Sequence, residues 1–142
     1  AADIRDYMGE RLNHIICNPP YLETGTHFPS PSRPKALAKG DATLKDWIDC
    51  AFRNLKSKGS LTLIHRADYT DKILREMGKR FGRVEIIPLW PKKGVAAKRV
   101  IIRAIKDSRA PAILHPGLVL HKPDGGYTAD AEKILRKIKP LN

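Results

Sequence analysis

The sequence predicts an α/β fold in which helices cover the faces of a mixed β-sheet. Three observations support this prediction. Segments with strand character alternate with amphipathic helical segments along most of the chain. The β-rich runs 83–89 and 98–106 are joined by Trp90–Ala97, a connection too short for a parallel crossover, so they should pair antiparallel. The length of 142 residues suits one domain with a modest core.

The first expected strand covers residues 11–17 and stops at Asn18-Pro19-Pro20-Tyr21. A short apolar run closed by prolines is typical of a buried strand that leads into a rigid loop. Residues 22–40 are rich in proline, glycine and polar residues and predict a long loop. Long loops within compact domains are often functional or disordered.

Two helices are expected next. Thr43 and Asp46 have the spacing of a capping box, and the apolar positions behind them recur at helical intervals until Gly59, which is expected to end the helix. Trp47 on this helix is expected in the core. A strand over 60–65 follows. The second helix should begin near Thr70 and end at Gly82, burying one apolar stripe: Ile73, Leu74, Met77 and Phe81.

The remaining elements are strands over 83–89 and 98–106, an extended segment over 112–121 and a closing helix. The turn Asp124-Gly125-Gly126 precedes this helix, which Thr128 should cap and which should run to about Lys137.

Composition excludes several classes of protein. No apolar run has membrane-spanning length and no signal-peptide pattern opens the chain, so a soluble protein is expected. Cys17 and Cys50 stand far apart without a CxxC, which argues for a reducing, cytoplasmic setting and against disulfides or a zinc site. The histidines show no metal-ligand spacing, so we expect no metal site: His14, His27, His65, His115 and His121.

The charge is strongly positive and uneven. Lysine and arginine number 27 against 15 acidic residues, which gives +12. Residues 92–142 carry 12 basic and 4 acidic side chains (12 − 4 = +8), and residues 1–91 carry 15 and 11 (15 − 11 = +4). Such a field attracts polyanions, so nucleic acid is a reasonable partner. A solvated basic surface that only keeps the protein soluble explains the charge equally well.

The motif Asn18-Pro19-Pro20-Tyr21 suits one particular chemistry. It should lie at the carboxyl end of its strand, where open α/β sheets place their ligands. The prolines hold the backbone extended, so the Asn18 side-chain oxygen and the Pro19 carbonyl can converge on one exocyclic amino group. Tyr21 then offers a face on which a base can stack. The competing reading is a stiff turn or a polyproline ligand patch.

Two such acceptors would solve a chemical problem. The lone pair of an aromatic amine is delocalised into its ring and is a poor nucleophile. Paired acceptors favour a more tetrahedral nitrogen, turn its lone pair toward an incoming methyl group and stabilise the developing charge. A strong general base is not required, and the sequence offers no obvious one.

At this motif the sequence resembles the amino-methyltransferases that carry Asn-Pro-Pro-Tyr. Within them it is most similar to the bacterial tRNA (adenine-N6)-methyltransferases that modify position 37 of a valine tRNA. The similarity covers nearly the whole chain, and its specific parts are residues 14–22, 44–66, 98–105 and 124–128. It implies a Rossmann-like class I methyltransferase fold and S-adenosylmethionine as cofactor. It also implies that Asn18, Pro19, Pro20 and Tyr21 bind the target amine, with Asn18 also near the cofactor, and that Asp3 approaches the adenine of S-adenosylmethionine.

The sequence departs from the family in one important respect. Family members carry a Gly-rich nucleotide-binding half before the Asn-Pro-Pro-Tyr strand, but this chain contains no Gly-x-Gly. Residues 1–142 are therefore expected to be the carboxyl-terminal portion of one catalytic domain. The missing amino-terminal half of the same domain would then pack against this chain as its partner. We expect such a fragment to be inactive and to bind S-adenosylmethionine weakly, which calorimetry can measure. A smaller departure is Asn13, where the family often has Asp.

Basic residues with a neighbouring Trp90 are candidates for holding RNA phosphates while the aromatic ring contacts a base. They lie in the long loop and around the hairpin connection: Arg33, Lys35, Lys92, Lys93, Lys98 and Arg99. The alternatives are a disordered polar loop and a lysine-protected strand edge. His65 and Arg66, which end a strand, are possible pocket residues.

Three functions therefore compete. The leading one is an RNA adenine-N6 methyltransferase that acts on tRNA, because a base in a single-stranded loop is easily splayed out. The second is methylation of a glutamine side-chain amide in a protein such as a release factor, because any planar NH₂ fits the same acceptors. The third is a non-catalytic RNA-binding module, which the missing Gly-rich loop favours and the intact motif disfavours.

Overall fold

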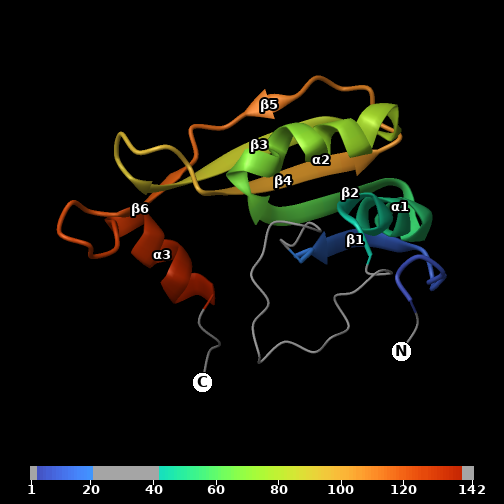
Figure 1. Ribbon diagram of the computed structural model, residues 1–142, viewed down its shortest axis with the longest axis horizontal. Helices are drawn as coiled ribbons and strands as arrows, with labels where there is room; N and C mark the ends of the chain where they lie inside the picture. Colours follow the sequence, from blue (N-terminus) through green and yellow to red (C-terminus); the bar gives the residue numbers. More distant parts are fainter. Residues whose placement is uncertain (1–2, 21–41, 139–142) are drawn as a thin grey trace.

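The computed structural model describes residues 3–20 and 42–138. In this part of the chain the strands form one mixed sheet in the order β1-β2-β4-β3-β5, and β6 also pairs with β3 (Figure 1). The predicted α/β class and mixed sheet are confirmed.

Strands β1 (Leu12–Cys17) and β2 (Leu55–Arg66) pair in parallel, and α1 (Leu44–Asn54) connects toward β2. Strands β3 (Phe81–Lys92) and β4 (Arg99–Lys106) pair antiparallel, which confirms the hairpin predicted from its short connection. Because β4 also pairs antiparallel with β2, the strands β1, β2 and β3 all run in the same direction.

The expected extended segment over 112–121 consists of two short strands, β5 (Ile113–Leu114) and β6 (Leu118–His121). Both pair in parallel with β3. Gly117 lies between them with φ +83°, and a Cβ atom there would lie only 2.3 Å from the Pro88 carbonyl oxygen. Close backbone contact therefore requires glycine at the break.

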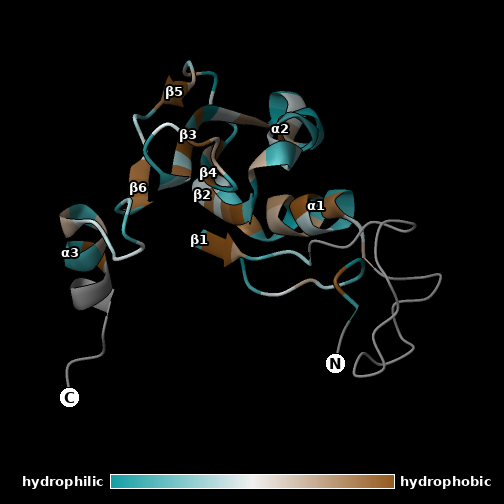
Figure 2. Ribbon diagram, turned by 60° about the vertical axis from the view of Figure 1, so that its left-hand side comes forward, coloured by the Kyte–Doolittle hydropathy of each residue, from teal (hydrophilic) through white to brown (hydrophobic). Residues whose placement is uncertain are grey.

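Helices α1 and α2 (Thr70–Met77) pack side by side against one face of the sheet (Figure 2). Short 3₁₀ turns flank α2, η2 (Ala67–Tyr69) before it and η3 (Gly78–Arg80) after it. The core between helices and sheet is formed by aliphatic side chains with almost no exposure, among them Ile48, Leu61, Leu63, Ile73 and Ile102. The last helix, α3 (Ala129–Ile138), begins after Thr128, whose Oγ1 accepts from the Ala131 amide at 3.2 Å, as predicted.

The start of α1 was predicted correctly, but its end was not. Thr43 and Asp46 form a reciprocal capping box. The helix ends at Asn54 rather than at Gly59, and β2 begins at once with the extended, fully buried Leu55. Lys106 from β4 explains this end, because its ammonium donates to the carbonyls of Phe52 and Leu55. The terminal carbonyls thus have a tertiary partner that no local pattern reveals.

Three further expectations were wrong in detail. Helix α2 ends at Met77, where Gly78 adopts φ +54°, so Phe81 and Gly82 belong to β3. Strand β1 is largely exposed rather than buried, and Ile16 is 75% exposed. The reason is position: within the described residues β1 pairs only with β2, so one edge and one face are free of packing. Trp47 is half-buried instead of lying in the core.

Candidate functional site at the carboxyl edge of the sheet

The common direction of β1, β2 and β3 brings three distant segments to one edge of the sheet. Asn18–Pro20 follows Cys17, which pairs with Leu63 of β2. Strand β2 ends at Arg66, opposite Arg99, and the connection over 93–98 follows the end of β3. We call this side the carboxyl edge, and Figure 1 shows the arrowheads of the three strands pointing to it. The sequence predicts that the motif lies at the end of a strand, but it does not predict that the hairpin connection lies at the same edge.

The Asn-Pro-Pro segment is anchored by one residue and exposes the two beside it. Pro19 is completely buried, whereas Asn18 and Pro20 are exposed. Along β1 the residues Ile15 and Cys17 face the helices, so the buried ring of Pro19 continues that inward-facing side. The Asn18 side chain is therefore not turned into the core. Tyr21, Arg33 and Lys35 lie outside the described residues.

The surroundings of the motif are apolar on the side that faces the core. Burial raises the pKa of the Cys17 thiol to about 12, and the nearby Cys50 adds to the effect. The thiol directly before Asn18 is therefore neutral and is not a ready nucleophile.

His65 and Arg66 serve structural contacts in the described part of the molecule. The His65 ring is 1% exposed, stacks on Tyr69 at a centroid distance of 4.8 Å and accepts from the Arg66 amide at 2.9 Å. Burial is the main cause that lowers the pKa of His65. Arg66 pairs with the Asp68 carboxylate. Neither side chain lines the groove described below, so their suggested pocket role finds no support there.

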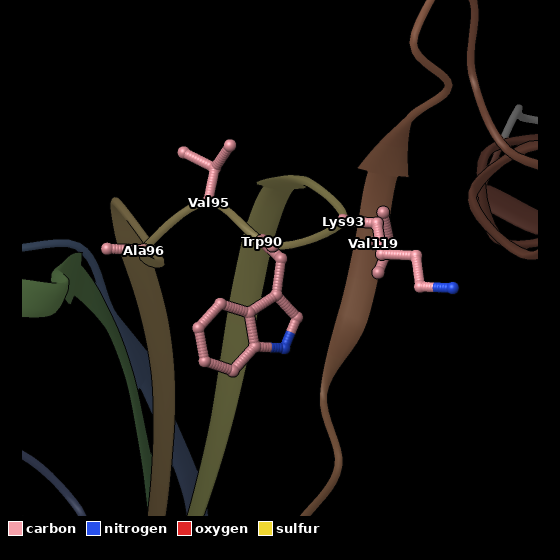
Figure 3. A pocket seen from close by; sticks show the side chains of 6 residues that line it. Trp90, Lys93, Val95, Ala96 and Val119 are labelled. Carbon is pink, nitrogen blue, oxygen red and sulfur yellow. The ribbon is translucent and has the colours of Figure 1, made fainter.

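Four of the predicted basic residues do surround the hairpin connection. Lys92, Lys93, Lys98 and Arg99 are all exposed, and no acidic residue occurs between positions 86 and 106. The structure also shows an open groove of about 440 Å³ at this place, which the sequence did not reveal (Figure 3). It is lined by residues of the hairpin and of β6: Trp90, Lys93, Gly94, Val95, Ala96 and Val119.

Asp3 is held at the opposite side of the sheet from Asn18. The arginine Arg53 donates to the carbonyls of Ile4 and Arg5, and Asn54 accepts from the Gly9 amide, so this segment lies where β1 and β2 begin. Hydrogen bonds from Arg5 lower the pKa of Asp3 to about 2. The structure thus does not bring Asp3 and Asn18 together, and the suggested contact of Asp3 with S-adenosylmethionine stays a prediction.

Within residues 3–20 and 42–138, no cluster of three or more histidine, cysteine or acidic side chains could hold a metal ion. No helix in the described part of the chain is long and apolar enough to cross a membrane.

No family model matches the chain. It is 23% identical over 136 residues to the tRNA1(Val) (adenine(37)-N6)-methyltransferase of Actinobacillus succinogenes, covering 96% of this chain and 56% of the relative. It is 25% identical over 133 residues to the protein of the same name from Shewanella amazonensis, covering 90% of this chain and 54% of the relative. The chain therefore spans about half the length of the curated relatives it matches.

Among solved structures, a protein of Agrobacterium tumefaciens described as a predicted O-methyltransferase superposes with a TM-score of 0.73. The identity is 28%, and the match covers 95% of this chain and 60% of that one. The chain has a methyltransferase fold. A chain from a type I R-M system shares the fold at a TM-score of 0.54 and 16% identity, with 95% of this chain and 30% of that chain covered.

The methyltransferase fold gives the geometry a context. An open α/β sheet of this kind binds its ligands outside the carboxyl ends of the parallel strands. In this chain that region is the carboxyl edge, which holds both the exposed Asn18 and the basic hairpin.

Proposed function

We propose that this chain forms the acceptor side of an S-adenosylmethionine-dependent methyltransferase that modifies an exocyclic planar nitrogen, namely adenine N6 in tRNA. One observation carries the proposal. Asn18 is exposed next to a completely buried Pro19, and it lies at the same edge of the sheet as the hairpin, which carries basic but no acidic residues between positions 86 and 106. The two curated relatives, named as tRNA adenine-N6 methyltransferases, support the choice of acceptor.

In the proposed mechanism the motif binds and orients the amine. The Asn18 side-chain oxygen and the Pro19 carbonyl accept its two hydrogens, and Tyr21 stacks against the base. This pairing directs the nitrogen lone pair toward the methyl group and stabilises positive charge as it develops. S-adenosylmethionine, when bound, supplies the methyl group from its sulfonium. The amine becomes acidic once methylated, so its proton can pass to water without a dedicated base.

The described residues fit the acceptor side of such a site better than the cofactor side. Asn18 offers an amide where the reacting nitrogen would lie, but the carboxylate of Asp3 is engaged by Arg5 at the other end of β1. We propose that residues 1–142 complete a larger catalytic domain with a cofactor-binding half beside β1. The exposed Ile16 and the one-sided pairing of β1 within the described residues support this arrangement, as does the length of the relatives.

The proposed RNA contacts are electrostatic and lie at the hairpin. Lys92, Lys93, Lys98 and Arg99 would bind phosphates and position the anticodon loop, while the motif binds the target base. Arg33 and Lys35, which follow the motif in the sequence, are proposed to add contacts to the RNA.

The test is replacement of Asn18 by alanine in the full-length enzyme, assayed by transfer of a labelled methyl group to tRNA. We expect kcat to fall at least about a hundredfold, as when one preorganised polar contact to a reacting centre is removed. Binding of tRNA should change little. Asn13→Ala is the matched control, because Asn13 is an exposed asparagine at the other end of β1. Unchanged turnover in Asn18→Ala would end the assignment.

The same assay separates the competing functions. Offering tRNA and a release factor side by side distinguishes the adenine amine from a glutamine amide. Digestion of the labelled RNA to nucleosides distinguishes N6-methyladenosine from an O-methylated product, which matters because the Agrobacterium protein is described as an O-methyltransferase. RNA binding without transfer to any acceptor would indicate a non-catalytic module.

A further inference from the structure

The groove at the hairpin is built from two elements that lie far apart in the sequence. Trp90 belongs to β3 and pairs with Val119 of β6, and the connection after β3 contributes Lys93 and Val95. Figure 3 shows the indole below this connection, with Val95 and Ala96 on one side and Lys93 and Val119 on the other. The walls are thus aliphatic, with one aromatic side chain among them.

Trp90 is fixed in place by the segment before β6. Its Nε1 donates to the Pro116 carbonyl at 3.0 Å. Gly117 packs directly against it, because a Cβ atom at Gly117 would lie 2.8 Å from Trp90 Nε1. Since the only polar atom of the ring already has a partner, the indole can recognise a ligand by its apolar surface alone.

The surroundings of the groove are cationic. Lys93 lines the groove, and Lys92, Lys98 and Arg99 lie close to the lining residues in the sequence. All four are exposed, and no acidic residue occurs from position 86 to 106. Val95, one of the apolar lining residues, is 44% exposed. An accessible apolar groove with positive charge on its hairpin side is complementary to a ligand that combines a flat apolar ring with a negative charge. A nucleotide has that combination.

We infer that this groove binds one unpaired nucleotide of a single-stranded RNA segment, with its base against Trp90 and Val95 and its phosphate near Lys93. This inference rests on the proposed RNA substrate and assigns a second nucleotide site, separate from the target base at Asn18. The volume of about 440 Å³ falls within the range of pockets that hold small ligands. Because the indole N–H is already paired, binding should tolerate any base.

The chain offers a direct spectroscopic probe. It has two tryptophans, Trp47 and Trp90, so Trp47→Phe leaves Trp90 as the single indole. The Nε1 of Trp47 is enclosed and has no hydrogen-bond partner among residues 3–20 and 42–138, so this replacement removes a donor that is unsatisfied there. Titration of the Trp47→Phe protein with single-stranded oligo(A) and oligo(U) should quench Trp90 fluorescence at low salt. The two oligonucleotides should bind with similar affinity.

Point variants locate the contacts by anisotropy of a labelled oligonucleotide. Val95→Glu places a negative charge in the groove at an exposed position and should weaken binding at least about fivefold, the effect of losing one base-stacking contact. Lys93→Ala should reduce the slope of log K against log salt concentration by about 0.7, the value for one phosphate contact with a single strand. Lys79→Ala is the matched control, because Lys79 is an exposed lysine before β3, at the other end of that strand.

The outcomes are distinct. Quenching by both oligonucleotides, lost in Val95→Glu and kept in Lys79→Ala, supports the site. Absence of quenching, or equal effects of Lys93→Ala and Lys79→Ala, overturns it. Stronger quenching by an acidic peptide such as oligoglutamate than by RNA would assign the groove to a protein partner and also overturns it. The assay needs no methyl donor, so it stays informative if Asn18→Ala shows that the proposed function is wrong.

Discussion

Replacing Lys106 by methionine tests how the sheet and α1 are joined. The lysine is 6% exposed, and its ammonium donates to the Phe52 carbonyl at 2.7 Å and to the Leu55 carbonyl at 2.8 Å. It also lies 4.2 Å from the centre of the Phe52 ring. Methionine keeps most of the aliphatic volume but leaves both carbonyls without this donor.

The expected loss follows from these contacts. A hydrogen bond to a charged group contributes about 1.5–3 kcal/mol, and a cation at a partly buried helix end contributes up to about 2 kcal/mol. Removing the ammonium also removes the cost of burying it, which offsets part of the loss. We therefore expect the free energy of unfolding to fall by about 2–4 kcal/mol. In a chain of this size that lowers the Tm by roughly 10 °C, from about 3–4 °C for each kcal/mol.

The measurement is urea unfolding followed by circular dichroism, with the midpoint expected to fall and the slope m to stay unchanged. Lys56→Met is the matched control, because Lys56 is an exposed lysine in β2 and its replacement should change stability by less than about 0.5 kcal/mol. If both variants lose the same amount, Lys106 does not cap α1 and the explanation for the helix end is wrong.

Three further predictions concern the cap, the thiol and the buried histidine. Thr43→Ala removes the acceptor of the Asp46 amide and should lower the free energy of unfolding by about 1 kcal/mol, which a thermal melt will detect. The half-buried Cys17, whose pKa is raised to about 12, should react with N-ethylmaleimide at pH 8 far more slowly in the folded than in the unfolded protein, and equally rapid labelling of both would contradict the raised pKa. Burial lowers the pKa of His65 below its ordinary 6.5. As the pH falls, the imidazole therefore becomes protonated in the unfolded state before it does so in the folded state, and the free energy of unfolding should decrease below about pH 6.5. The variant His65→Phe keeps a ring that can stack on Tyr69 but cannot be protonated. Lowering the pH from 7 to 5 should therefore reduce its free energy of unfolding less than that of the unaltered protein.

Several features of this protein follow from local patterns in its sequence. The Thr43–Asp46 box predicts the start of α1 because both partners lie within one helical turn. The short connection expected over Trp90–Ala97 predicts an antiparallel hairpin because no crossover fits in it. The prolines after Cys17 predict the end of β1 for the same kind of local reason. Of the candidate site, the sequence indicated the Asn-Pro-Pro motif and the basic residues, each as a separate segment.

Tertiary structure decided what these segments do together. Whether β1 is buried depends on its neighbours in the sheet, and the end of α1 depends on Lys106, which lies more than fifty residues from the helix carbonyls it binds. The groove exists because β6 returns alongside β3 and the Pro116 carbonyl fixes the Trp90 ring. Most important for function, the parallel direction of β1, β2 and β3 brings Asn18 and the basic hairpin to one edge. Contacts between residues distant in sequence set these features, so no local pattern could predict them.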